Sequence, residues 1–230
     1  MRKIVSIGLL YFLTGAFMAC NNEEKTASEQ KTAAKSEAAT PAKTVKNILI
    51  FGNSLTAGYG LEQAESYPAQ LQNRLDSLKL PYKIINAGVS GETTSGGNSR
   101  LDWVLKNPVD IFILELGGND GLRGIPASET RKNLQSMIDK VKAKYPDAKI
   151  ILAGMQVQPS MGKKYADEFR VIYPEMSKQN NVELIPFLLE NVGGEVKLNQ
   201  KVGIHPNAVG AGIVAENVWK VLEGRLVQEL

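Results

Sequence analysis

Short apolar runs alternate along this chain with segments whose apolar residues recur at helical spacing, and this alternation restricts the possible folds most strongly. Several runs are apolar at consecutive positions, which is typical of strands buried on both faces. Strands that alternate with helices form a parallel sheet with helices on both sides. We therefore predict an α/β fold, a three-layer α/β/α sandwich with a parallel five-stranded sheet. The predicted strands span residues 47–51, 82–86, 109–116, 149–153 and 182–187.

Three of the connecting segments have clear helical patterns. Ser66 is suited to cap a helix that carries Leu71, Leu75 and Leu78 on one face. The last helix is predicted to open at Pro206 and Asn207. The apolar stripes of the other two helices are Leu134, Met137, Ile138, Val141 and Tyr145 in one, and Ile213, Val214, Val218, Val221 and Leu222 in the other.

The N-terminal residues have the pattern of an export signal. Arg2 and Lys3 precede an apolar stretch, residues 4–19, that is shorter than the roughly 20 residues needed to span a bilayer. Residues 17–20, Phe-Met-Ala-Cys, resemble the lipobox of bacterial lipoproteins, in which the cysteine becomes N-terminal and acylated. We expect residues 1–19 to be a lipoprotein signal peptide and Cys20 to anchor an exported protein in the bacterial cell envelope, in the periplasm or at the outer membrane. The alternative is an ordinary secretory signal with an incidental cysteine.

Composition separates a tether from a folded domain. Residues 20–44 are mostly small and polar, too poor in apolar surface to offset chain entropy, and are predicted to be disordered. Residues 45–230 suffice for one core but not comfortably for two. This domain has 21 basic and 20 acidic residues without basic clusters, which gives no electrostatic reason to expect a nucleic-acid partner. Cys20 is the only cysteine, so neither an internal disulfide nor a thiolate zinc site is expected.

Polar segments follow the predicted strands where they end, and ligands of open parallel sheets bind outside these carboxyl ends. Ser54 follows the first strand, Gly91 lies in the loop after the second, and Asn119 follows the third. His205, the only histidine, precedes the last helix. A serine hydroxyl beside an imidazole base is a common arrangement for nucleophilic catalysis. The four loops are therefore expected to converge on one pocket.

Each of these residues has a simpler interpretation when taken alone. Ser54 suits a helix cap, Gly91 a turn and Asn119 an Asx turn, and a His-Pro pair before a helix is a common loop feature. We favour a shared site because four separate loops would otherwise have to imitate one by chance. A phosphate-binding loop at residues 91–97 is a weaker alternative, because this glycine-rich stretch lacks the Gly-Lys-Ser/Thr ending.

Four blocks carry a family resemblance: Gly52-Asn53-Ser54-Leu55, residues 88–93 with Gly91, Gly117-Gly118-Asn119-Asp120, and Gly203-Ile204-His205-Pro206-Asn207. In this order and spacing they resemble the SGNH-type (GDSL) serine hydrolases, in particular the bacterial thioesterase, lysophospholipase and arylesterase subgroup. The resemblance covers residues 47–222 and implies the flavodoxin-like sandwich of that family. It differs from the Gly-x-Ser-x-Gly elbow of α/β-hydrolases, because Thr56 stands where the second glycine would be.

The resemblance implies a role for each matched residue. Ser54 is the expected nucleophile and also an oxyanion donor through its backbone N–H. Gly91 and the side-chain amide of Asn119 are the expected second and third donors, and His205 is the expected general base. Fixed donors stabilise the developing oxyanion, each typically by about 3 kcal/mol. This chemistry requires no cofactor and no metal.

Two positions depart from the family pattern. The family usually has an aspartate three residues before the histidine, where it accepts the second imidazole N–H, and this position is Val202 here. Loss of such an acid lowers turnover about 10⁴-fold in a well-studied serine protease. We predict a Ser54–His205 dyad in which a backbone carbonyl of the same loop, such as that of Val202, orients the base. Asn53 replaces the aspartate of the Gly-Asp-Ser-Leu consensus and is expected to brace its loop, with little kinetic consequence of the change. Asp120 is expected either to brace its loop in the same way or to be a turn residue.

The expected reaction is hydrolysis of a small-molecule carboxylic ester or thioester through an acyl-enzyme. Pocket walls are predicted from residues 121–126, 155–161 and 187–192, which follow strand ends. Three alternatives remain: a carbohydrate O-deacetylase with the same serine chemistry, a catalytically weakened binding module because of Val202, and a nucleotide-binding protein. The residues that suit an acyl chain or an aromatic group are Met155, Val157, Pro159 and Met161.

Overall fold

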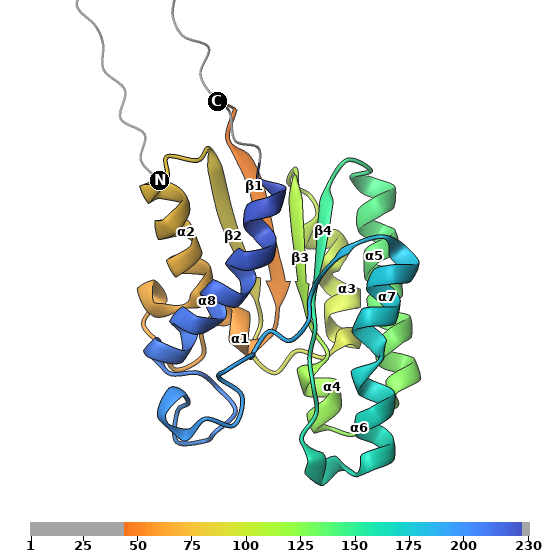
Figure 1. Cartoon of the computed structure of the whole chain (residues 1–230). Coiled ribbons are helices and arrows are strands. Elements are labelled where there is room, and N and C mark those ends of the chain that lie inside the picture. Colours follow the sequence, from red (N-terminus) through yellow and green to blue (C-terminus); the bar gives the residue numbers. More distant parts are fainter. Residues whose placement is uncertain (1–43, 227–230) are drawn as a thin grey trace, which may run out of the picture. The chain divides into compact units, whose positions relative to one another are not determined.

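A parallel sheet of five strands forms the centre of the computed structural model, which describes residues 44–226. The strand order is β2-β1-β3-β4-β5, and all four neighbouring pairs are parallel (Figure 1). The predicted α/β class and the five-stranded parallel sheet are therefore confirmed. The strands span Lys46–Gly52 (β1), Tyr82–Gly88 (β2), Ile111–Glu115 (β3), Lys149–Ala153 (β4) and Glu183–Ile185 (β5).

Helices cover both faces of this sheet (Figure 1). Helices α2 and α8 pack together on one side, and α3, α5 and α7 form the layer on the other. The eight α-helices of the described residues span Ser54–Ala57 (α1), Tyr67–Ser77 (α2), Thr94–Val104 (α3), Gly118–Leu122 (α4), Ala127–Lys144 (α5), Lys163–Arg170 (α6), Ile172–Asn180 (α7) and Ala208–Leu222 (α8). Short 3-10 helices cover Gln63–Glu65, Pro159–Met161, Val196–Leu198 and Glu223–Arg225.

The core lies on both faces of the two central strands. Residues 48–51 of β1 and all of β3 are buried, as their unbroken apolar runs predicted. Burial of one large aliphatic or aromatic side chain stabilises the fold by about 1.5–3 kcal/mol. The one charged residue of β3, Glu115, is also fully buried, and it is the last residue of this strand, at the carboxyl edge of the sheet.

The helix caps follow the sequence pattern closely. The Ser66 hydroxyl accepts the N–H of Ala69 at the start of α2, and the side chain of Asn207 accepts the N–H of Gly210 at the start of α8. The prediction that Leu78 belongs to the buried face of α2 is wrong. This residue follows the last turn as the C-cap, and it is 53% exposed.

The predictions for the N-terminal residues concern a part of the chain that lies outside the described residues. They include the signal peptide at 1–19, the lipidated Cys20 and the tether at 20–44, of which only residue 44 is described. Within residues 44–226, no helix has both the length and the apolar character needed to cross a membrane.

Candidate active site

The candidate site lies at the carboxyl edge of the sheet, beside strand β1. The strand order turns at β1, with β2 on one side and β3 on the other, and such a switch point leaves a crevice between the loops. Ser54, Gly91, Asn119 and His205 all line one cavity of about 620 Å³ there. The structure thus brings together the four residues that the sequence motifs predicted, although they come from four separate loops.

Ser54 occupies the first position of α1, directly after β1. Gly52 permits the sharp turn, because a Cβ at this position would approach the Thr56 hydroxyl to 2.2 Å and the Glu115 carboxylate to 2.4 Å. The side chain of Asn53 caps the helix by accepting the N–H of Leu55 at 2.9 Å. A residue in the first helical turn has no intrahelical acceptor for its own N–H. The turn therefore presents both the hydroxyl and the backbone N–H of Ser54 at the cavity.

His205 reaches Ser54 from the loop before α8. Its Nε2 atom lies 2.9 Å from Ser54 Oγ, although 151 residues separate the two in sequence. The alternative acceptor for the serine hydroxyl, Asn53 Oδ1, is farther away at 3.4 Å. The histidine contact is therefore the shorter one, and it has the length of a good hydrogen bond.

The other nitrogen of the imidazole, Nδ1, is buried and neither accepts nor donates a hydrogen bond within the described residues. The prediction that a backbone carbonyl of this loop, such as that of Val202, orients the imidazole is therefore wrong. The loop closes on itself through a bond from the N–H of Gly203 to the carbonyl of Gln200. Val202, the second of the two residues enclosed by this turn, is 71% exposed. Burial without a charged partner lowers the pKa of His205 below its usual value, because desolvation disfavours the imidazolium.

Gly91 lies in a tight turn after β2. The N–H of Glu92 bonds to the carbonyl of Val89, and Gly91, the third residue of this turn, has a φ of +80°. A positive φ at the third position is the mark of a type II turn, and it favours glycine. Arg123 donates to the carbonyl of Gly91 at 2.9 Å and holds this peptide against the loop that follows α4.

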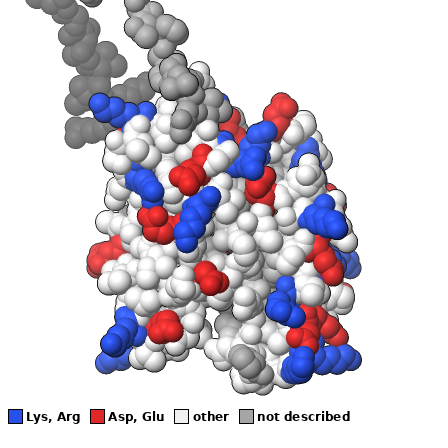
Figure 2. Space-filling view, viewed as in Figure 1, with Lys and Arg blue, Asp and Glu red and all other residues white. Residues whose placement is uncertain are grey.

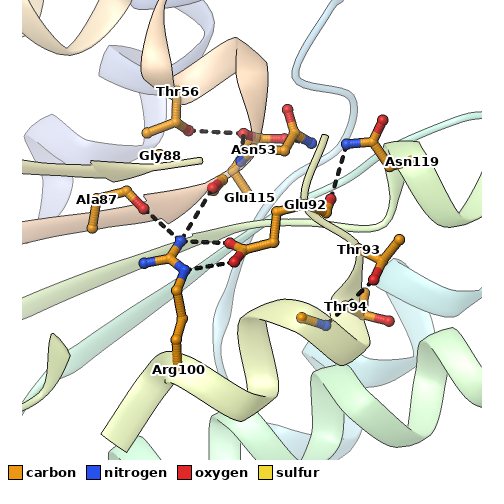
Figure 3. Close-up of polar contacts among 12 residues, drawn as sticks. Asn53, Thr56, Ala87, Gly88, Glu92, Thr93, Thr94, Arg100, Glu115 and Asn119 are labelled. Atoms are coloured by element: carbon orange, nitrogen blue, oxygen red, sulfur yellow. Dashed lines mark hydrogen bonds and ion pairs between the residues drawn. The ribbon is translucent and has the colours of Figure 1, made fainter. Parts of the chain in front are cut away.

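Asn119 lies in the first turn of α4 and connects two of the loops. Its Nδ2 donates to the carbonyl of Glu92 at 2.9 Å (Figure 3). Because an amide nitrogen carries two hydrogens, this bond leaves one of them for a ligand. The side chain of Glu92 pairs with Arg100, which also donates to the carbonyl of Ala87 at 2.7 Å. The loop that carries Gly91 is therefore held by side chains from both sides.

Asp120, next to Asn119, has the contacts of a bracing residue. Its fully buried carboxylate accepts the backbone N–H of Thr94 at 2.9 Å and the hydroxyl of the same residue at 2.5 Å. The start of α3 is thereby attached to α4. Asp120 does not line the cavity, and neither does Val202.

A buried carboxylate beneath the nucleophile was not predicted from the sequence. Glu115 accepts the backbone N–H of Asn53 at 3.0 Å, its side-chain amide at 2.7 Å and the hydroxyl of Thr56 at 2.8 Å (Figure 3). Thr56 in turn lies 2.7 Å from the hydroxyl of Tyr67. Asn53 therefore braces the turn as expected, and the structure identifies its partner. Burial raises the pKa of Glu115 to about 7, although these hydrogen bonds oppose the shift.

The raised pKa of Glu115 predicts a pH-dependent stability. A carboxyl group that binds its proton more tightly in the folded chain than in the unfolded chain stabilises the fold below pH 4.5, and this stabilisation is lost as the pH rises to about 7. A difference of this size corresponds to about 3 kcal/mol. We expect Glu115→Gln to flatten the change in unfolding free energy between pH 5 and 8, measured by urea denaturation. The exposed Glu195→Gln is the control, and an equal pH slope in wild type and Glu115→Gln contradicts the assignment.

The cavity wall is largely apolar. Besides Tyr59 and the motif residues around Ser54, Gly91 and Asn119, its lining comes from the three predicted segments and from residues 193–194, 199 and 203–204, which were not predicted as pocket walls. These lie in the long connection before α8, which has too little regular structure to be placed from sequence. The side chain of Pro159 lies outside the described part of the chain. The apolar lining residues are Leu55, Leu122, Met155, Val157, Met161, Phe187, Leu189 and Ile204.

The polar groups of the cavity are those of a nucleophilic site. Among the described residues, no group of three or more His, Cys, Asp and Glu side chains is arranged to hold a metal ion. Lys and Arg are interspersed with Asp and Glu over the face shown in Figure 2, and no single sign covers a large area. A serine hydroxyl bonded to an imidazole, with an apolar cavity beside it, defines the site of a serine hydrolase.

Comparisons with known proteins agree with this class. The model of the GDSL-like Lipase/Acylhydrolase family matches residues 50–213. The chain is 37% identical over 179 residues to a protein named esterase TesA from Pseudomonas aeruginosa, covering 77% of this chain and 88% of that protein. It is 35% identical over 177 residues to thioesterase 1/protease 1/lysophospholipase L1 of Escherichia coli strain K12, covering 76% of this chain and 83% of that protein. A crystal structure of TesA covers 79% of this chain and 100% of that chain, with a TM-score of 0.75 and 37% identity.

This chain belongs to the GDSL-like lipase/acylhydrolase family. The resemblance inferred from the four sequence blocks is confirmed, and the fold is that of its solved relatives.

Proposed function

We propose that this protein hydrolyses carboxylic esters or thioesters through an acyl-enzyme on Ser54, with His205 as the general base. The observation that carries the proposal is the 2.9 Å contact between Ser54 Oγ and His205 Nε2 at the rim of the cavity. The names of its relatives, an esterase and a thioesterase/lysophospholipase, support the same reaction class.

The reaction proceeds in two steps. His205 Nε2 takes the proton of the Ser54 hydroxyl as Oγ attacks the carbonyl carbon of the substrate, and the alcohol or thiol leaves with that proton. Water then attacks the acyl-enzyme, loses its proton to Nε2, and releases the carboxylic acid and free Ser54. His205 must be neutral to act, so its lowered pKa keeps it competent at mildly acidic pH.

Three groups are placed to stabilise the oxyanion of both steps. They are the backbone N–H groups of Ser54 and Gly91 and the second amide hydrogen of Asn119, all of which belong to cavity-lining residues. Their positions are held by the bonds of Asn53, Arg123 and Glu92 described above. Donors that are held before the reaction do not need to reorganise as charge develops, which is the main benefit of such a site.

The apolar cavity favours an ester with a hydrophobic acyl or aromatic group. We expect p-nitrophenyl esters of short and medium acyl chains, together with acyl thioesters, to be hydrolysed faster than acetylated sugars. A panel of these substrates at equal concentration tests the proposal. Selective deacetylation of sugars indicates the carbohydrate O-deacetylase instead, and no turnover of any ester indicates a binding module.

The N-terminal sequence supports a location for this reaction. We expect Cys20 to be acylated after cleavage of residues 1–19, so that the domain is anchored to the bacterial cell envelope. Metabolic labelling with a fatty acid tests this directly. Label on the wild type but not on Cys20→Ser supports the anchor, and an unlabelled wild type rejects it.

A further inference from the structure

The imidazole of His205 is held in an unusual way for a catalytic base. Its Nδ1 atom is buried without a hydrogen bond, so no carboxylate or carbonyl in the described chain sets the rotation of the ring. The ring instead lies against Tyr59, with ring centroids 4.7 Å apart and an angle of 36° between the planes. This distance is within the range of favourable aromatic contacts.

Tyr59 is attached to the nucleophile on one side and to the histidine loop on the other. Its N–H donates to the carbonyl of Ser54 at 3.0 Å. Its own carbonyl accepts Nε2 of Gln200 at 2.7 Å, and the same nitrogen donates to the carbonyl of Pro206 at 2.9 Å. The backbone N–H of Gln200 donates to the carbonyl of His205 at 2.8 Å.

The two loops also approach each other closely. A Cβ at Gly60, the residue after Tyr59, would come within 2.3 Å of Oε1 of Gln200. Both Gly60 and Tyr59 have exposed surface, so this contact is not a by-product of core packing. The side chain of Gln200 thus joins the turn of Ser54 to the loop of His205.

We propose that Tyr59 is a positioning residue that, held by Gln200, keeps the imidazole of His205 over Ser54 in a chain whose triad acid is replaced by Val202. This assignment rests on the proposed function of the Ser54–His205 pair. The Tyr59 ring blocks rotation of the imidazole away from Oγ. Its π face also favours the imidazolium that forms when the serine loses its proton.

The test compares Tyr59→Leu, which removes the ring, with Tyr59→Phe, which keeps it. The control is Trp103→Leu, a change of another exposed aromatic residue that lies at the end of α3 and outside the cavity. We expect Tyr59→Leu to lower kcat on a short p-nitrophenyl ester by about tenfold or more, with a smaller change in KM. The kcat of Tyr59→Phe is expected to stay within about twofold of the wild-type value, and Trp103→Leu is expected to have the wild-type kcat.

A second readout does not depend on activity. His205 is the only histidine, so its ring signals in an NMR spectrum need no assignment among several residues. We expect Tyr59→Leu to move these signals towards those of a freely rotating histidine, and Tyr59→Phe to preserve the wild-type signals. Gln200→Ala is expected to cause a smaller shift in the same direction and a several-fold loss of kcat.

The outcomes separate this assignment from the proposed function. Wild-type kcat and wild-type histidine signals in both Tyr59→Leu and Gln200→Ala overturn the positioning role while the hydrolase stands. An equal loss in Tyr59→Phe and Tyr59→Leu also overturns it, because the hydroxyl rather than the ring is then responsible. If the wild type hydrolyses no ester, the proposed function fails, and the NMR comparison alone decides whether Tyr59 holds the ring.

Discussion

Replacing Ser54 with alanine is expected to lower kcat on a short p-nitrophenyl ester by about 10⁴-fold or more. No other hydroxyl lies within hydrogen-bond distance of His205 Nε2 among the described contacts, and removal of the nucleophile in well-studied serine proteases causes losses of this size or greater. The change removes one hydrogen bond of a small side chain, so unfolding should become easier by only about 1 kcal/mol.

The matched control for this change is Ser99→Ala. Ser99 is exposed on α3 and bonds only to the carbonyl of Ser95 in its own helix. It should keep wild-type kcat and KM. A Ser54→Ala variant that folds and still retains a tenth of the wild-type kcat contradicts the proposed mechanism.

Replacing Val202 with aspartate is expected to raise kcat by about tenfold or more. A carboxylate beside the unpaired Nδ1 of His205 would set the ring tautomer and stabilise the imidazolium, a contribution that reaches about 10⁴ in a complete triad. Only part of this gain is expected, because the side chain at position 202 is largely exposed and a carboxylate there keeps much of its hydration.

The same variant should change the pH profile in a defined direction. The base acts when neutral, so activity falls as the pH drops through the pKa of His205. Burial lowers this pKa in the wild type, and a neighbouring carboxylate raises it. The acid limb of kcat/KM should therefore move to higher pH in Val202→Asp. Val196→Asp, at an 88% exposed position outside the cavity lining, is the control, and an identical profile in all three proteins contradicts an unpaired base.

The strands could be predicted because a strand buried on both faces appears in the sequence as a run of consecutive apolar residues. Residues 149–153 were placed without error, and 47–51 differ from β1 by one residue at each end. Helix α3 was missed because its first turns contain serine, glycine and asparagine, which have low helix propensity. Its position depends instead on tertiary packing, since a Cβ at Gly97 would come within 2.4 Å of Leu116.

The site residues also fall into those that the sequence predicts and those that only the tertiary structure reveals. Ser54, Gly91, Asn119 and His205 lie in short motifs at strand ends, and the sheet topology is enough to bring them together. Glu115 and Tyr59 carry no such signal. Glu115 lies inside the predicted strand 109–116, and nothing in the sequence around it indicates its partner, because its contact with Asn53 spans 62 residues. Tyr59 contacts His205 although 146 positions separate them in the sequence, and no local sequence pattern predicts a contact of this kind.

Mass spectrometry after treatment with a fluorophosphonate tests whether His205 activates Ser54 as a nucleophile. The probe forms a covalent bond only with an activated hydroxyl. We expect one adduct per folded chain, on the peptide that contains Ser54, and slower labelling of His205→Ala. An unmodified Ser54 in folded protein, or an adduct on a different residue, would contradict it.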